Sequence, residues 1–172
     1  MVRRGVASDA EALAVFAART FADTFAAGNR AHDMEAHLAA SYGVSQQSNE
    51  LNDPAVITLL AHSGERLVAY AQVRRGSAPA CVTHEQAVEL HRFYVDRPVH
   101  GRGVAGTLMS EVHGAALRLG GRHLWLGVWE RNLRAIAFYA KMGFVRVGSH
   151  DFHVGSDRQT DHVLVASVRR AL

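Results

Sequence analysis

The feature that most constrains the fold of this chain is a glycine-rich turn between an apolar strand and a helix. The strand predicted over Glu89–Val95 is followed closely by His100–Gly106, which reads His-Gly-Arg-Gly-Val-Ala-Gly, and then by an apolar helical run. A helix N-terminus exposes unpaired amides and a partial positive charge, and small residues let the backbone approach an anion. The residues alone allow two interpretations: a cradle for a diphosphate, or a strand-to-helix turn without a ligand.

The remaining periodicities predict two N-terminal helices, a β-hairpin and two strand–helix–strand crossovers. The first helix is expected to begin at the capping box Ser8–Glu11, and the second after Asp33, ending near Tyr42. The other expected elements are strands over Val56–Ala61, Leu67–Arg74, Glu89–Val95, His123–Trp129, Phe144–Val147 and Asp161–Val168, and helices over Val104–Leu119 and Asn132–Met142. This order predicts a mixed sheet with helices on both faces, an α/β or α+β fold, in a single domain of residues 1–172.

Composition narrows the classes of function. Apolar residues make up 48% of the 172 residues and charged residues 20%, which is typical of a globular protein. No apolar run is long enough to span a bilayer, and Asp9 and Glu11 interrupt any signal-peptide pattern, so a cytoplasmic protein without a membrane partner is expected. The single cysteine, Cys81, predicts no internal disulfide. The net charge of +3 comes with scattered arginines, so no nucleic-acid partner is expected.

A second motif lies in the helix predicted after residue 131. Asn132 and Tyr139 are seven residues apart, about two helical turns, and therefore share a helix face. An ordinary amphipathic helix ended by Gly143 would show the same pattern. His150 and His153 fall in a strand pattern that points them to opposite faces, and no third ligand has zinc-like spacing, so no metal is expected.

Taken in this order, the two motifs resemble those of the GNAT superfamily of N-acetyltransferases. The family loop has Gln or Arg, two residues, Gly, one residue, then Gly or Ala, and is matched here by His100, Gly103 and Ala105. His100 is the departure from the pattern. The resemblance implies a mostly antiparallel mixed sheet flanked by helices on both faces. It also implies an enzyme that moves an acetyl group from acetyl-CoA to a primary amine by direct attack in a ternary complex.

The resemblance also implies roles for individual residues. Tyr139 would lie beside the thioester sulfur, where a phenol that stays protonated at neutral pH can donate a proton to the departing thiolate. Asn132 would contact the pantetheine or phosphate region, and Lys141 a phosphate. The backbone would supply the remaining contacts, with the pantetheine arm on Phe93, Tyr94 and Val95 and the pyrophosphate on His100, Gly101, Arg102, Gly103, Val104, Ala105 and Gly106.

An amine arrives as an ammonium ion, so the enzyme needs a base. Glu89 is the first candidate, because it lies fourteen residues before Gly103, as the glutamate base does in histone-acetylating members of the superfamily. His91 is the second candidate and has the more suitable ordinary pKa. Strand alternation predicts Glu89, His91 and Phe93 on one face, unless a bulge shifts the phase.

The acceptor is the open question. Thr24-Phe25, Trp125–Asn132 and Gln159–Asp161 resemble bacterial spermidine/spermine acetyltransferases, which implies a polyamine acceptor. A polyamine needs carboxylates, and candidates in the first third of the chain are Asp23, Glu35, Glu50 and Asp53, although solvated helix faces give the same pattern. The alternatives are acetylation of protein or peptide N-termini and a non-catalytic CoA-binding module. Relatives of this kind commonly dimerise, so the resemblance also allows a homodimer.

Overall fold

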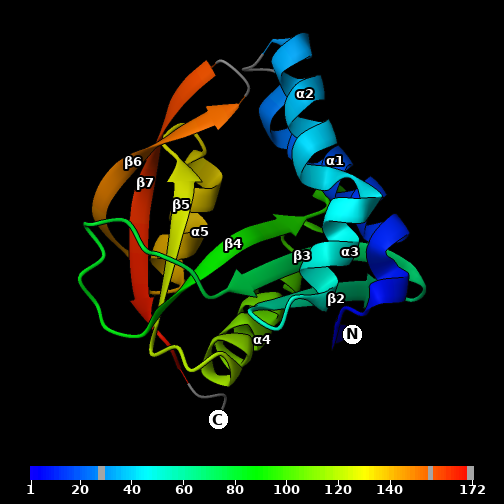
Figure 1. Ribbon diagram of the computed structural model, residues 1–172. Coiled ribbons are helices and arrows are strands. Elements are labelled where there is room, and N and C mark those ends of the chain that lie inside the picture. The colour runs from blue at the N-terminus through cyan, green and yellow to red at the C-terminus, as the bar shows by residue number, and fades with distance from the viewer. Residues whose placement is uncertain (27–29, 155–156, 170–172) are drawn as a thin grey trace.

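The computed structural model describes residues 1–26, 30–154 and 157–169. Seven strands form one sheet in the order β1-β2-β3-β4-β5-β7-β6, and every neighbouring pair is antiparallel except β4 and β5 (Figure 1). The strands are β1 (Val2–Arg4), β2 (Val56–Ser63), β3 (Arg66–Arg74), β4 (Ala87–Val95), β5 (His123–Trp129), β6 (Val145–Val154) and β7 (Asp157–Ser167). The helices are α1 (Ala10–Phe25), α2 (Ala31–Tyr42), α3 (Val44–Asn52), α4 (Val104–Arg118) and α5 (Leu133–Lys141). The predicted mixed, mostly antiparallel sheet is therefore confirmed.

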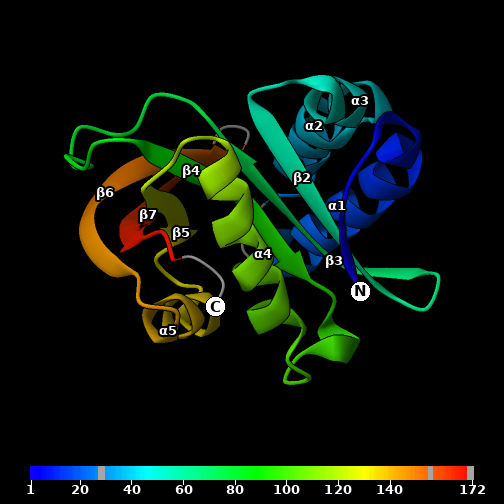
Figure 2. The same ribbon diagram turned by 90° about the horizontal axis from the view of Figure 1, so that it is seen from below.

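Helices cover both faces of this sheet, with α4 on one side of β2–β4 and α1–α3 on the other (Figure 2). Strand alternation in β3 divides the core between the two sides. Ala69 and Ala71 join the cluster built around α4, whereas Tyr70, which lies between them, joins the cluster of α1 and α2. Each helical layer thus packs on its own set of alternating strand residues.

Strands β4 and β5 separate after a short stretch of parallel pairing, and this separation opens the sheet. Three parallel pairs join them, the last being Glu89 with Trp125, and no later pair is formed along these two fully described strands. The register of β3 against β4 shifts between Gln72 and Val73, which leaves His91 as the extra residue of a β-bulge. Beyond this bulge, β4 has β3 as its neighbour on one side and an open edge on the other.

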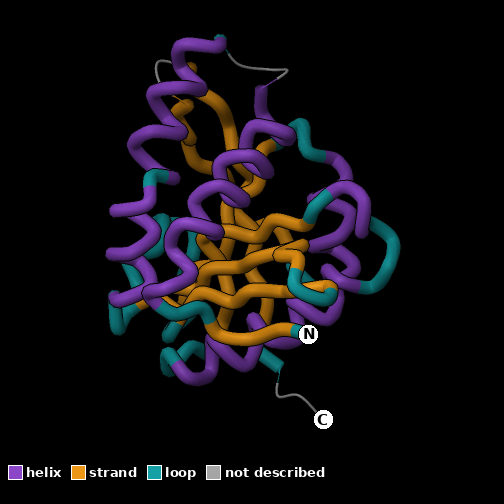
Figure 3. Tube along the Cα trace, turned by 90° about the vertical axis from the view of Figure 1, so that its right-hand side faces the viewer, coloured by secondary structure: helices purple, strands orange, loops and turns teal. Residues whose placement is uncertain are grey.

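Several predicted elements differ from the observed ones. The sequence did not predict the short strand β1 or the polar helix α3. Strand β1 lies at the lower edge of the sheet in Figure 3, beside the label N. Gln47 is the one buried residue of α3, so the helix carries no apolar stripe to read. Strands β6 and β7 are longer than predicted. Helix α1 extends to Phe25, and residues 27–29, between α1 and α2, lie outside the described part.

The predicted helix caps were also wrong. Helix α1 begins after Asp9, whose carboxylate accepts hydrogen bonds from the Val6 amide at 2.9 Å and from Arg3, so the Ser8–Glu11 box is not the cap. Helix α2 begins at Ala31, and Asp33 lies buried in its first turn instead of capping it. In the described residues, no helix is both long and apolar enough to cross a membrane.

Candidate active site

A cavity of about 1270 Å³ opens between the separated strands β4 and β5. Nearly all residues that the sequence proposed for the site line it: Glu89, His91, Phe93, Tyr94, Val95, His100, Gly101, Gly103, Ala105, Gly106, Asn132, Tyr139 and Lys141. Arg102 and Val104 are not among the lining residues. Arg102 is exposed, and the side chain of Val104 packs against the α4 core. The fold thus gathers residues from four separate elements around one space.

The glycine loop presents unpaired amides to this cavity. Gly103 is the residue before α4 and has a φ of +82°, and Gly101 has a φ of +75°, a region that favours glycine. The first helical bond runs from the Thr107 amide to the Gly103 carbonyl at 3.1 Å, which leaves the preceding amides of α4 without helical partners. The predicted amides of His100 and Arg102 are not available, because they already donate to the Arg97 and Val99 carbonyls at 3.1 and 3.3 Å. A Cβ atom at Gly101 or Gly103 would meet no atom within 4 Å. An open cradle of free amides fits a diphosphate.

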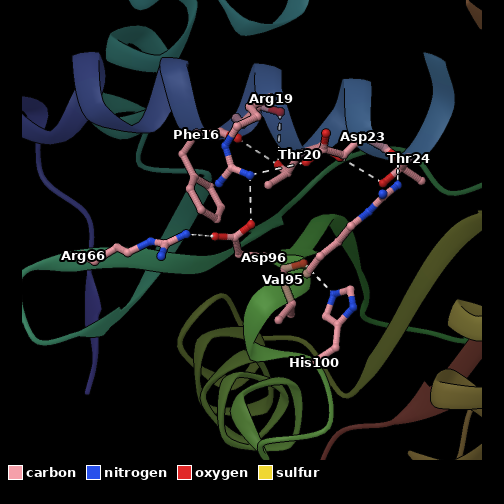
Figure 4. Close-up of polar contacts among 11 residues, drawn as sticks. Phe16, Arg19, Thr20, Asp23, Thr24, Arg66, Val95, Asp96 and His100 are labelled. Carbon is pink, nitrogen blue, oxygen red and sulfur yellow. Dashed lines mark hydrogen bonds and ion pairs between the residues drawn. The ribbon is translucent and has the colours of Figure 1, made fainter.

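His100, the atypical residue of the loop, ties three elements together. Its Nε2 lies 2.8 Å from the Val95 carbonyl at the end of β4, and its Nδ1 lies 2.6 Å from the Arg134 guanidinium on α5 (Figure 4 shows the first contact). Because an arginine can only donate, Nδ1 accepts, and Nε2 carries the proton donated to Val95. His100 therefore acts through its ring as a brace between β4 and α5.

Asp96 anchors the start of the loop. It follows β4 directly, is 2% exposed, and pairs with Arg19 of α1 at 2.9 Å and with Arg66 of β3 (Figure 4). The hydrogen bond from Arg19 is the main reason that the pKa of Asp96 is lowered. The next residue, Arg97, donates to the Asp23 carbonyl on α1. The loop is thus fastened to the helix on the opposite face of the sheet.

The open edge of β4 offers backbone groups to the cavity. The Asp96 amide donates to Val68 of β3 at 2.8 Å, so the backbone groups of Val95 point the other way, toward the gap. The Val95 carbonyl already accepts from His100, which leaves its amide facing the gap. The Tyr94 side chain stacks on Tyr70, 5.6 Å away, and so faces α1.

Tyr139 reaches the cavity from α5. Its ring makes edge contacts with Phe93 at 6.2 Å and Phe144 at 5.6 Å, and 8% of the residue is exposed. Burial raises the pKa of Tyr139 above its ordinary value, so the phenol remains a proton donor at neutral pH. Asn132 caps α5 by accepting a hydrogen bond from the Ala135 amide at 3.2 Å, which leaves its Nδ2 as the free polar group. Lys141 is exposed at the end of the helix.

Glu89 and His91 form a hydrogen-bonded pair. Glu89 Oε1 lies 3.2 Å from His91 Nδ1, while Oε2 accepts from Arg74. Burial alone would raise the pKa of Glu89, but the hydrogen bonds from His91 and Arg74 hold it below its ordinary value. Burial lowers the pKa of His91, against the opposing effect of Glu89. His91 is therefore neutral at pH 7, with Nδ1 donating to Glu89 and Nε2 left as an acceptor.

The bulge at His91 changes the phase of β4. Glu89 and His91 remain in contact, but Phe93 lies on the other face, against Tyr139 and the α4 cluster. The unshifted alternation, which puts all three residues on one face, is therefore wrong. The consequence is that the pair Glu89–His91 and the phenol of Tyr139 approach the cavity from different faces of the sheet.

Aromatic side chains close the α1–α2 side of the cavity. Phe25 of α1 contacts Trp129 of β5 with ring centroids 5.5 Å apart. His37 of α2 meets Phe152 of β6 edge-on at 6.0 Å. These contacts join α1 to β5 and α2 to β6 along one side of the cavity.

The carboxylates that the sequence offered for a polyamine are mostly neutralised. Glu50 pairs with Arg92, Asp23 pairs with Arg19 at 3.3 Å, and Asp53 accepts from the Ala55 amide. Glu35 is exposed on α2. The sequence named Asp161 only within the Gln159–Asp161 resemblance and gave it no role of its own. Asp161 is 8% exposed and lines the cavity. Its place in a strand, alternating with buried Val163, was the available signal. In the described residues, no three metal-ligating side chains gather.

Comparison with known proteins places these features in a family. Residues 17–144 match the model of the Acetyltransferase (GNAT) family. This chain belongs to the GNAT family. An uncharacterized N-acetyltransferase of Mycobacterium tuberculosis is 34% identical over 158 residues, which covers 92% of this chain and 97% of the relative. The GNAT assignment makes the chain an N-acetyltransferase.

Solved structures share the GNAT fold. The PaiA N-acetyltransferase from Thermoplasma acidophilum in complex with coenzyme A superposes with a TM-score of 0.78 at 19% identity, covering 97% of this chain and 98% of its own. An acetyltransferase from Salmonella typhimurium with its cofactor acetyl-CoA gives a TM-score of 0.67 at 18% identity, with 100% and 95% coverage. The seven-stranded sheet and its flanking helices therefore have the GNAT fold.

Proposed function

We propose that this chain transfers an acetyl group from acetyl-CoA to a primary amine of a small molecule, in a ternary complex. The observation that carries the proposal is the meeting of three features in one cavity: the amide cradle at the start of α4, the phenol of Tyr139 and the pair Glu89–His91. The two GNAT structures described above contain coenzyme A or acetyl-CoA. Acetyl-CoA would supply an activated thioester.

The residues of this chain divide the proton transfers between them. His91 Nε2 takes a proton from the acceptor ammonium, directly or through a water, and Glu89 positions the imidazole through Nδ1. The neutral amine attacks the thioester carbonyl, the carbon–sulfur bond breaks, and the nitrogen releases its second proton, which replaces through water the proton that Tyr139 gives up. Tyr139 gives its proton to the departing thiolate, and the Val95 amide faces the gap where the carbonyl oxygen develops charge. Glu89 is thus a positioning residue, because Arg74 already holds its carboxylate.

The closed acceptor side favours a small amine over a protein terminus. The contact Phe25–Trp129 bridges α1 and β5, and His37–Phe152 bridges α2 and β6, where a peptide acetyltransferase needs an open groove. Aromatic faces and alkyl ammonium groups attract each other, which suits a polyamine, the acceptor class that the sequence resemblance implies.

A panel of amines with acetyl-CoA, read as release of free thiol, tests the proposal. We expect turnover with spermidine, spermine and simple primary amines. Turnover of N-terminal peptides alone would contradict the small-amine assignment. Binding of CoA without thiol release from any amine would identify a non-catalytic CoA-binding module.

A further inference from the structure

Two buried polar atoms that can accept a hydrogen bond lie on the β7–β6 side of the cavity without hydrogen-bond partners in the described part of the chain. They are Oδ1 of Asp161 and Nε2 of His150. Both residues line the cavity. Buried polar groups in native proteins nearly always have partners, so a cluster of unsatisfied atoms facing a cavity indicates a place for a polar ligand.

Gly127 makes room for this cluster. A Cβ atom at Gly127 would lie 2.8 Å from His150 Nε2 and 3.0 Å from Asp161 Oδ2, so both side chains fold over the strand at the one residue that lacks a side chain. Gly127 is two residues beyond Trp125, which pairs with Glu89. One strand spacing and a two-residue rise put the α-carbons of Glu89 and Gly127 about 8 Å apart. A short alkyl chain could therefore span the distance from this cluster to Glu89 and His91.

Charge distinguishes Asp161 from the other carboxylates of the cavity. Arg74 pairs with Glu89, and Arg92 pairs with Glu50. In the described residues, the basic side chain next to Asp161 is His150, whose Nε2 lies 3.9 Å from Asp161 Oδ2. Burial raises the pKa of Asp161 to about 6, which is the expected behaviour of a carboxyl group without a cationic partner.

We propose that Asp161, together with His150, binds a second ammonium group of the acceptor, so that this enzyme prefers diamines or polyamines to monoamines. The inference rests on the proposed function, which places the reacting amine beside His91. The ammonium supplies the positive counter-charge that the buried carboxylate lacks, and it donates hydrogen bonds to Oδ1 of Asp161 and Nε2 of His150. The rings of Trp125 and Trp129 line the same cavity and suit the methylene chain between the two nitrogens.

The test compares 1,4-diaminobutane with 1-aminobutane, which differ in the second amine. For the wild type, we expect a lower KM for the diamine. In Asp161→Asn, the ratio of the KM for 1-aminobutane to the KM for 1,4-diaminobutane should fall about tenfold or more, because a charge-assisted hydrogen bond is lost. The matched control is Asp151→Asn on β6, an exposed aspartate paired with Arg158 at 2.9 Å, which should leave the ratio unchanged.

A binding measurement separates this inference from the proposed function. Calorimetric titration of 1,4-diaminobutane into the protein saturated with CoA should show binding that Asp161→Asn weakens about tenfold or more, whether or not any amine is acetylated. Diamine binding without turnover would defeat the proposed function and leave the subsite standing. The subsite is refuted if Asp161→Asn leaves both the KM ratio and the diamine affinity unchanged, or raises both KM values equally.

Discussion

Replacing Asp161 by asparagine should make the unliganded enzyme more stable at neutral and alkaline pH. The ionised carboxylate is buried without a strong cationic partner, and burial raises its pKa from 3.8 to about 6. The folded chain therefore holds this proton more tightly than the unfolded chain does. The stability that the group contributes is fully present below pH 3.8 and is lost as the pH rises through about 6.

The size of the effect follows from the two pKa values. Each tenfold change in a protonation equilibrium corresponds to about 1.4 kcal/mol, so ionised Asp161 costs up to about 3 kcal/mol above pH 6. Asparagine has the same shape and no charge, and its amide can donate toward His150 Nε2. For a domain of this size, the gain corresponds to a rise in Tm of roughly 5–10 °C. His150 lies beside Asp161, and the other titratable groups that line the cavity include Glu89 and His91 on β4, His37 and Glu50 on the helical side, and Tyr139 and Lys141 on α5.

Urea denaturation of the unliganded protein at pH 4, 6 and 8 measures the effect. The free energy of unfolding of Asp161→Asn should exceed that of the wild type at pH 8, and the difference should shrink to nearly zero by pH 4. Asp151→Asn, on the exposed face of β6, should follow the wild type throughout. The reasoning is refuted if Asp161→Asn is no more stable than the wild type at pH 8, or if its gain is the same at every pH.

Three further variants test the remaining assignments. Tyr139→Phe should lower kcat at least tenfold with little change in CoA affinity, and unchanged turnover would remove the phenol from the acid role. Burial lowers the pKa of His91 below its ordinary value, so the kcat/KM of the wild type should fall on the acid side of pH 6.5. Glu89→Gln removes a group that raises this pKa, so the acid limb of the profile should move to lower pH. An acid limb that does not move would show that Glu89 does not act on the base. Asp96→Asn breaks two ion pairs with arginines at the base of the loop. It should lower the free energy of unfolding by about 2 kcal/mol and raise the KM for acetyl-CoA. A variant as stable as the wild type in calorimetry would show that Asp96 does not anchor the loop.

The fold was largely predictable because its strands and crossover helices carry apolar periodicities. The strand β5 and the helices α4 and α5 lie within a residue of their predicted bounds. Helix α3 was hidden because polar residues form it and tertiary contacts, instead of an apolar stripe, hold it in place. The three residues of β1 were missed because so short an edge strand depends on its pairing with β2.

The site was predictable where one local motif contains the chemistry, and not where two distant strands combine to make it. The glycine loop and Tyr139 each lie in a single continuous motif, which is why they could be proposed. The pairing of Glu89 with Arg74 joins β4 to β3, and the register shift at His91 decides which side chains meet. Whether Asp161 has a cationic partner depends on the residues that surround it in three dimensions, so the sequence spacing could not predict it.

The attachment of Asp96 to α1 has a consequence for how the two substrates communicate. The same helix that presents Phe21 and Phe25 to the acceptor space also holds the base of the donor loop through Arg19. A donor that restrains the glycine loop therefore also restrains α1 with Phe21 and Phe25, and an acceptor that restrains α1 also restrains the loop. Thermodynamic reciprocity then requires that each substrate change the affinity of the other by the same factor. Donor and acceptor should bind this enzyme as a cooperative pair.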